Sequence, residues 1–265
     1  MCARFTAFSI GCGSWNRARS AFSQAGAFRC ASSTGADRNS TMCATRGAPR
    51  TQQHEGSMKR LATILGIAAM SLWGAAAFAA QPIVFVHGYS GSSSNFNTMM
   101  SRFAATGQPT NMMYGFDYAS LVNSNETSAS QLRSFVNTVR SRHGNAQVTI
   151  IAHSNGGLVA RWYRVMLGGS SANNRFISLG SPHSGTTWAY ACFSPACFDM
   201  RPLSLMITTL AGRGCDRSLW SATDGIIIPA SSARCGTSIQ TVSVDHLSLL
   251  TNSSVFNQVR ALTPQ

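Results

Sequence analysis

Residues 147–167 read QVTIIAHSNGGLVARWYRVML, and the fold can be worked out from this stretch. The run 147–152 is apolar and rich in β-branched residues, which is typical of a strand buried on both faces of a parallel sheet. From Leu158 to about Leu167 the apolar residues favour a helix. Only residues 153–157 separate the two, so the sequence predicts a strand that enters a helix through a sharp turn.

Strands and helices alternate on both sides of this stretch. The runs that predict strands are residues 83–86, 112–118, 147–152, 176–180, 217–221 and 238–244. Helices are expected over about residues 95–105 and 158–167, and a further helix begins at a cap provided by Thr127 or Ser128. This alternation predicts an α/β fold with a mostly parallel sheet, right-handed crossovers and helices on both faces. Because no repeat and no linker interrupt it, we expect a single domain.

The turn at residues 153–157 has the context of a nucleophile elbow, in which a serine occupies a strained turn between a strand and a helix. Ser154 would stand above the sheet edge, and the small residues Ala152 and Gly156 would leave room for the neighbouring backbone. The N-terminus of the following helix would place N–H groups and a positive dipole end beside a developing oxyanion. A phosphate-binding turn, or a merely tight turn, is the alternative interpretation.

A second motif follows the first predicted strand, where His87-Gly88-Tyr89 begins a glycine-containing loop. In a fold of this kind, the oxyanion receives one N–H from such a loop and one from the residue after the nucleophile. We therefore expect the backbone N–H groups of Tyr89 and Asn155 to form an oxyanion hole. On its own, His-Gly after a strand is also compatible with an ordinary turn.

A serine nucleophile needs a base that accepts its proton and an acid that orients the base. In this fold the chain order is serine, acid, histidine, and only His183 and His246 follow Ser154. His183 comes directly after the strand that follows the elbow helix, too early to follow an acid, so we expect it to shape the rim of the site. His246 stands on a late loop and is the predicted base.

The candidates for the acid are Asp199, Asp216, Asp224 and Asp245. Asp224 follows the predicted strand 217–221, so its carboxylate would lie at the same sheet edge as the serine. Asp245 adjoins the predicted base but would point elsewhere if strand alternation persists, and Asp199 begins a predicted helix, where capping explains it. The predicted triad is therefore Ser154, Asp224 and His246, with an acyl-enzyme formed on the serine.

The N-terminal residues differ from the rest. Residues 58–79 have the three parts of a secretory signal: a basic start, an apolar stretch, and Ala77-Phe78-Ala79, after which we expect cleavage. A membrane anchor is the alternative, because the apolar stretch just reaches ~20 residues.

Residues 1–57 lack periodicity, and codons for Glu55-Gly56 would resemble a ribosome-binding site before Met58. We expect residues 1–57 to be a translated leader, with a real N-terminal extension as the alternative.

Four cysteines remain in the expected domain, residues 80–265, namely Cys192, Cys197, Cys215 and Cys235. An even number in an exported chain suggests two disulfides, and three pairings are possible. We favour Cys192–Cys197 and Cys215–Cys235, because the first pair brackets a Ser-Pro turn. Neither the cysteines nor the histidines have metal-ligand spacing, and acids are too few for a calcium site, so we expect no metal and no cofactor.

The charge of the chain does not indicate nucleic-acid binding. Its 21 Lys and Arg against 8 Asp and Glu give a formal charge of +13, but residues 1–60 hold nine of the basic residues and two of the acids. From residue 81 onward there are 12 Arg and 6 acids, a surplus of six, and no basic run. With 44% hydrophobic residues, the chain is expected to form a globular, mildly cationic and soluble domain.

Five segments together carry a family resemblance: VHG at 86–88, AHSNGG at 152–157, LGSPHSGT at 179–186, TDG at 223–225 with Pro229, and DHL at 245–247. From about Pro82 to Leu262 the chain resembles the small secreted bacterial lipases and esterases of the class 2 lipase type. The resemblance implies a compact α/β-hydrolase domain that acts, without a cofactor, on carboxylic esters of acylglycerols or simple acyl chains. Asn155 departs from the Met or Gln usual after the serine, which would change the polarity of the pocket.

Residues 80–265 are too few for a large lid, so we expect the segment 188–206 to form one wall of the site, unless its aromatic residues belong to the core. The expected function is that of a secreted serine hydrolase, a lipase or esterase. A polyester depolymerase or acyltransferase with the same triad is one alternative, and a catalytically silent member of the fold that binds lipid or a partner is another. We expect a small-molecule or lipid ester substrate, no nucleic-acid partner, no stable membrane insertion after signal removal, a monomer, and an extracellular or periplasmic location.

Overall fold

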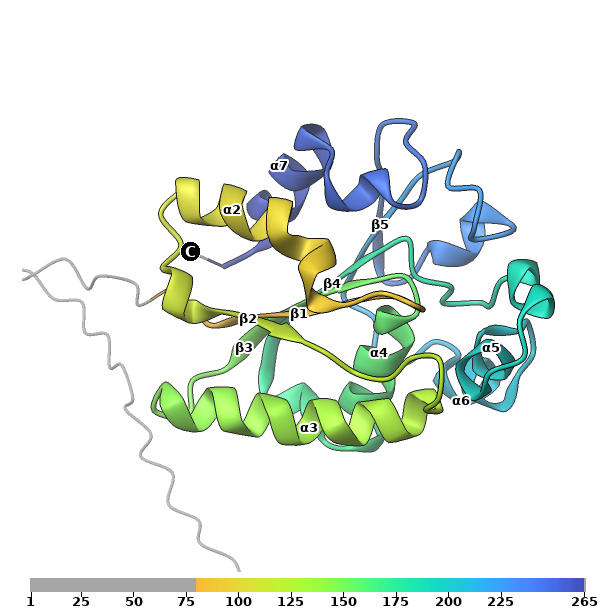
Figure 1. Cartoon of the computed structure of the whole chain (residues 1–265), viewed down its shortest axis with the longest axis horizontal. Coiled ribbons are helices and arrows are strands. Elements are labelled where there is room, and N and C mark those ends of the chain that lie inside the picture. The colour runs from red at the N-terminus through yellow and green to blue at the C-terminus, as the bar shows by residue number, and fades with distance from the viewer. Residues whose placement is uncertain (1–79, 265) are drawn as a thin grey trace, which may run out of the picture. The chain divides into compact units, whose positions relative to one another are not determined.

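A parallel sheet runs through the part of the chain that the computed structural model describes, residues 80–264 (Figure 1). In pairing order its strands are β2 (Met113–Phe116), β1 (Ile83–Val86), β3 (Val148–His153), β4 (Asn173–Leu179), β5 (Arg217–Trp220) and β6 (Thr237–Gln240). Each neighbouring pair is parallel, which confirms the predicted α/β fold. The predicted leader (1–57) and signal (58–79) lie outside the described residues.

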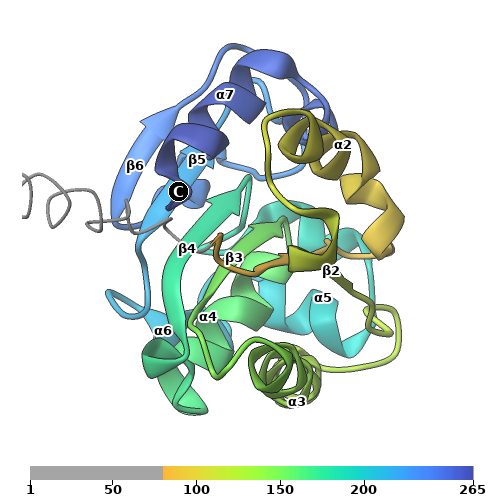
Figure 2. The same cartoon turned by 90° about the vertical axis from the view of Figure 1, so that its left-hand side faces the viewer.

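Helices cover both faces of the sheet (Figure 2). On one face lie α2 (Asn97–Ala105) and α7 (Ser253–Leu262), and on the other lie α3 (Asn125–Arg142) and α4 (Gly156–Met166). The short helices α5 (Pro195–Met200) and α6 (Leu205–Leu210) pack beside α3 and α4. The predicted arrangement, a single domain with helices on both faces, is therefore confirmed.

β1 shows why both faces must be covered. Its alternate residues Val84 and Val86 belong to the core beneath α3 and α4, whereas Ile83 and Phe85 belong to the core beneath α2 and α7. All four side chains are fully buried, because successive side chains of a strand point to opposite faces. A strand buried on both sides needs an uninterrupted apolar run, and its carboxyl end leaves the core beside those of its parallel neighbours.

α3 begins earlier than the sequence predicts. The hydroxyl of Ser124 accepts the backbone N–H of Thr127, so Ser124 is the N-cap, and the expected cap at Thr127 or Ser128 is wrong. A carboxylate from a distant helix, that of Asp199, accepts the N–H of the first helical residue, Asn125. The polar first turn is therefore helical because tertiary contacts satisfy its free N–H groups.

Two other boundaries also differ. The last strand, β6, ends at Gln240 rather than at 244, because the hydroxyl of Ser221 accepts the N–H of Val244 at 3.0 Å and donates to its carbonyl at 2.6 Å. These bonds draw the chain after Gln240 into a loop across the end of β5. The helix expected over 95–105 begins with a short 3₁₀ turn, Ser93–Phe96, before α2.

Two disulfides link segments of the described chain. They join Cys192 to Cys197 and Cys215 to Cys235, with Cα–Cα distances of 5.8 and 5.5 Å, so the favoured pairing is confirmed. Within residues 80–264, we find no helix with the length and apolarity that crossing a lipid bilayer requires.

Candidate active site

The turn between β3 and α4 holds Ser154 in a strained backbone conformation. Its φ of +54° lies in the left-handed region, which residues with a side chain adopt only where the surrounding structure demands it. The turn packs tightly against the end of β1: a Cβ on Gly156 would lie 2.4 Å from the carbonyl oxygen of His87, and one on Gly88 would lie 2.7 Å from the Cβ of Ser154. The predicted need for a small residue at Gly156 is therefore confirmed.

A histidine and a carboxylate from two later loops are joined by buried hydrogen bonds. The Nδ1 atom of His246 lies 2.8 and 2.9 Å from the two carboxylate oxygens of Asp224. One of these oxygens also accepts the N–H groups of Ile226 and Ile227, at 3.0 and 2.8 Å. Backbone N–H groups fix the carboxylate, and the carboxylate is hydrogen-bonded to Nδ1. The other ring nitrogen of His246, Nε2, can therefore bond to a group in the cavity.

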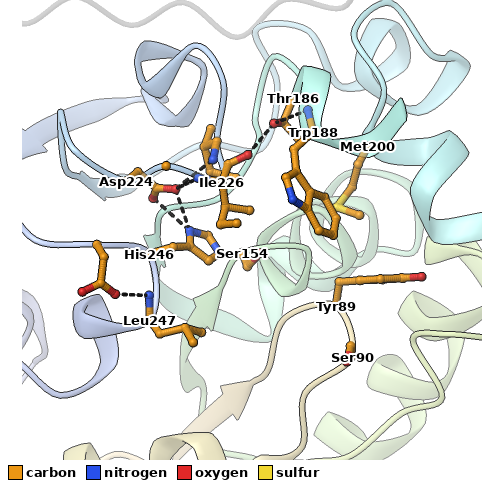
Figure 3. A pocket seen from close by; sticks show the side chains of 13 residues that line it. Tyr89, Ser90, Ser154, Thr186, Trp188, Met200, Asp224, Ile226, His246 and Leu247 are labelled. Atoms are coloured by element: carbon orange, nitrogen blue, oxygen red, sulfur yellow. Dashed lines mark hydrogen bonds and ion pairs between the residues drawn. The ribbon is translucent and has the colours of Figure 1, made fainter. Parts of the chain in front are cut away.

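Ser154, Asp224 and His246 line one cavity of about 590 Å³. The imidazole of His246 lies between the carboxylate of Asp224 and Ser154 (Figure 3). No hydrogen bond joins Ser154 to His246 among the contacts of the described residues; such bonds are often long without a bound substrate. Most of the remaining wall is apolar and is formed by Tyr89, Trp188, Met200, Ile226, Ile227 and Leu247.

The two predicted oxyanion donors border this cavity or adjoin it. Tyr89 lines it, and Asn155 directly follows Ser154 at the start of α4. Within residues 80–264, neither backbone N–H donates to another protein group, whereas the N–H of Ser90 is bound to the hydroxyl of Ser120 at 2.9 Å. Both N–H groups therefore have no acceptor in the described part of the chain, as the prediction of an oxyanion hole requires.

Comparison with known proteins finds a family match over part of the chain. Residues 80–198 match the sequence pattern of the family described as lipase (class 2). Over these residues the chain is similar to the class 2 lipases. The described residues also share their fold with three solved structures at 16–18% sequence identity.

Lipase BlEst2 from Bacillus licheniformis, in its mature form, has 18% identity and a TM-score of 0.59, with coverage of 71% of this chain and 94% of that one. Lipase B from Aspergillus fumigatus has 16% identity and a TM-score of 0.58, with coverage of 70% of this chain and 53% of that one. The product of the gene lin2722 from Listeria innocua has 16% identity and a TM-score of 0.52, with coverage of 69% and 93%. Together they show the α/β-hydrolase fold.

The other candidate acids bond to partners other than His246. Asp216 pairs with Arg175 and Arg217 at the opposite end of the strands. Asp245 is exposed and accepts the N–H groups of Leu247 and Ser248, and hydrogen bonds from Ser248 lower its pKa. No group of three or more His, Cys, Asp or Glu side chains that could hold a metal occurs in the described part of the chain.

The expected role of Asp199 as the cap of its own helix is wrong. Ser194 caps α5, since its hydroxyl accepts the N–H of Cys197. The carboxylate of Asp199 instead accepts the N–H of Asn125, at the start of α3, at 2.8 Å. Burial raises the pKa of Asp199 to about 6.

His183 does not shape the rim of the site, contrary to expectation. It is buried, with Nε2 at 2.8 Å from the hydroxyl of Ser178 and Nδ1 at 3.3 Å from the guanidinium of Arg161. Burial and the neighbouring Arg161 lower its pKa well below 6.5. The chain after β4 turns inward, so this histidine supports the packing of α4 rather than the cavity.

The side chain of Asn155 does not face the pocket, so the expected change in pocket polarity is wrong. It is fully buried and forms two reciprocal hydrogen bonds with the amide of Asn125, of 2.8 and 2.7 Å. It is also 3.4 Å from the hydroxyl of Tyr118.

The expected wall is confirmed in part. Trp188 and Met200 line the cavity, on the side opposite Asp224 and His246 (Figure 3). Phe193 and Phe198 are 78% and 47% exposed, so these aromatic side chains are not core residues. The ring of His153, the residue before Ser154, contacts the ring of His246, with ring centres 4.5 Å apart; no local sequence pattern predicted this contact.

Proposed function

We propose that this protein is a secreted serine hydrolase that cleaves carboxylic esters through Ser154, His246 and Asp224. One observation carries the proposal: Ser154, on its strained turn, lines the same cavity as a histidine whose Nδ1 is bound to a buried carboxylate. Nucleophilic catalysis by serine needs such a base and such an orienting acid.

In the proposed reaction, the hydroxyl of Ser154 attacks the ester carbonyl carbon while Nε2 of His246 accepts the hydroxyl proton. Asp224 keeps Nδ1 protonated and stabilises the imidazolium that forms. The backbone N–H groups of Tyr89 and Asn155 stabilise the negative oxygen of the tetrahedral intermediate. His246 then protonates the departing alcohol, leaving an acyl group on Ser154, and next activates the water that releases the acid.

The apolar cavity wall supports an ester with a hydrophobic part. Trp188, Met200, Ile226 and Ile227 offer no charge to a ligand, and the cavity has the size usual for small-molecule sites, about 300–1,000 Å³. We propose that this wall binds the acyl chain of an acylglycerol or of a simple ester. The triad itself does not select chain length, so the substrate profile has to be measured.

The proposed location is outside the cytoplasm. Two disulfides in the described residues are typical of proteins that fold in an oxidising compartment. We propose that residues 58–79 direct export and are removed after Ala79, and that the exported protein is a monomer. N-terminal sequencing of the exported protein should begin at Ala80, and its mass by light scattering should be that of one chain; retention of residues 58–79 would contradict the proposal.

Two measurements test the proposed activity. Hydrolysis of p-nitrophenyl esters from butyrate to palmitate, by the protein expressed from its full sequence, should be lost in Ser154→Ala. A fluorophosphonate probe should label the wild type and not this variant. Equal hydrolysis by both proteins would refute the role of Ser154, and a folded wild type that neither hydrolyses nor reacts with the probe would favour a silent, binding member of the fold.

A further inference from the structure

The side chain of Tyr89 is held by the loop that precedes α5. The hydroxyl of Ser194 donates to the phenol oxygen of Tyr89 at 3.1 Å. The Tyr89 ring meets Trp188 edge-on, with ring centres 6.1 Å apart, and packs in a cluster that contains Cys192 and Cys197. The loop therefore contacts one residue of the proposed oxyanion hole.

The same segment also reaches the other residue of the oxyanion hole, through one intermediate. The amides of Asn155 and Asn125 bond to each other twice, at 2.8 and 2.7 Å, with both side chains fully buried. The backbone N–H of Asn125 donates to the carboxylate of Asp199, on α5, at 2.8 Å. Asn125 thus connects α5 with the elbow, through its backbone N–H on one side and its side-chain amide on the other.

The segment that contains Ser194 and Asp199 is held in place by its own contacts. The Cys192–Cys197 disulfide closes it, and the hydroxyl of Ser194 accepts the N–H of Cys197 within that loop. The guanidinium of Arg201 donates to the carbonyl of Cys192 at 3.1 Å and lies over the ring of Phe198 at 4.2 Å. A segment held in this way can fix the positions of the groups it contacts.

We propose that residues 192–200, here called the bridging segment, position the two proposed oxyanion donors from outside the cavity. Ser194 acts on the backbone N–H of Tyr89 through the tyrosine side chain. Asp199 acts on the backbone N–H of Asn155 through Asn125. This inference rests on the proposed function. Ser194, Asn125 and Asp199 do not line the cavity, so they are positioning residues and not catalytic ones. Since an oxyanion donor acts on the transition state, loosening it should lower kcat and leave KM nearly unchanged.

The Tyr89 contact is tested by Ser194→Ala, Tyr89→Phe and the double variant. Tyr89→Phe removes only the hydroxyl and keeps the ring and the N–H. We expect each single variant to lower kcat about tenfold, with KM within about twofold, and the double variant to lose no more than either single one. Unchanged kcat in the single variants, or losses that multiply in the double variant, would contradict this contact as the cause.

The Asn155 contact is tested by Asn125→Ala, with Ser124→Ala as its matched control. Loss of the Ser124 cap costs α3 about 1 kcal/mol without touching Asn155. We expect Asn125→Ala to lower kcat about ten- to a hundredfold, with KM retained, and Ser124→Ala to keep kcat. If both variants lose kcat equally, the effect is one of helix stability and the proposal is wrong.

The disulfides offer a second matched pair. Cys192→Ser with Cys197→Ser should lower kcat about tenfold. Cys215→Ser with Cys235→Ser removes a disulfide that does not line the cavity, and it should keep kcat even where the melting temperature falls. Equal kcat losses in the two double variants would overturn the proposal.

Fluorophosphonate labelling of the wild type distinguishes a failure of the proposed function from a failure of the inference about the bridging segment. If the wild type is not labelled at Ser154, the proposed function fails. If it is labelled and active but the bridging-segment variants keep wild-type kcat, only the inference about the bridging segment fails.

Discussion

The imidazole of His153 supports the histidine that we propose as the base. Its Nε2 lies 3.0 Å from the backbone carbonyl oxygen of His246, and the centres of the two rings are 4.5 Å apart. His153 directly precedes Ser154 at the end of β3, so one short stretch of chain presents the proposed nucleophile and also holds the loop of its base.

Removal of this contact should impair both folding and the proposed reaction. His153→Leu leaves the carbonyl of His246 without its donor, which should lower the free energy of unfolding by about 1–3 kcal/mol. We expect kcat to fall about tenfold as the His246 loop shifts. His153→Gln, which retains a side-chain N–H donor, should recover part of both losses. Denaturant unfolding and ester kinetics measure the two effects, and a fully active His153→Leu would exclude the supporting role.

The strain at Ser154 predicts a difference between two inactive variants. Glycine adopts a φ of +54° without steric cost, whereas alanine does not. We expect Ser154→Gly to be more stable than Ser154→Ala by about 1 kcal/mol. Urea unfolding of the two proteins compares them, with loss of probe labelling expected in both. Equal stability would show that the turn is not strained.

Acid should destabilise the fold through its buried histidines. Burial lowers the pKa of His87, and lowers those of His153 and His183 well below 6.5. Near pH 6.5 and below, the unfolded chain takes up protons that the folded chain does not. The free energy of unfolding is therefore fully present above pH 6.5 and falls as the pH falls, by up to ~1.4 kcal/mol per pH unit for each histidine. Unfolding curves between pH 8 and pH 5 measure this slope, and a flat profile would contradict it.

Asp199 should have the opposite effect. Burial raises its pKa from 3.8 to about 6, so the folded protein binds this proton more tightly than the unfolded chain does. The carboxylate therefore costs stability above pH 6, and the cost disappears as the pH falls toward 3.8. Asp199→Asn keeps an oxygen for the N–H of Asn125, and should raise the free energy of unfolding by about 1 kcal/mol at pH 8, allowing for partial exposure.

At pH 4 the same variant should match the wild type. Unfolding curves at the two pH values provide the comparison, with the wild type measured in parallel. A variant that is less stable than the wild type at pH 8 would mean that the charge at the start of α3 stabilises the fold.

Several local expectations were wrong for one shared physical reason. The cap of α3 is three or four residues earlier than expected, β6 is shorter, and His183 is buried rather than at the rim. Hydrogen bonds to other elements contribute in each case: Asp199 accepts the N–H of Asn125, Ser221 bonds to Val244, and Arg161 bonds to His183. Such partners leave no periodic pattern near the residue concerned.

The sequence by itself determined the strands, because apolar runs must be buried on both faces of a parallel sheet. It also determined the turn at Ser154 and the need for Gly156, because the crowded turn admits no side chain there. The predicted order of serine, acid and histidine follows from the fold class. Only the tertiary structure decided what surrounds these residues. The contacts of Asn155 with Asn125, of Asn125 with Asp199, and of Tyr89 with Ser194 span 30, 74 and 105 residues of chain. Hydrogen bonds of this kind exist only after packing has brought remote polar groups together and excluded water from them, and no local pattern of residues encodes them.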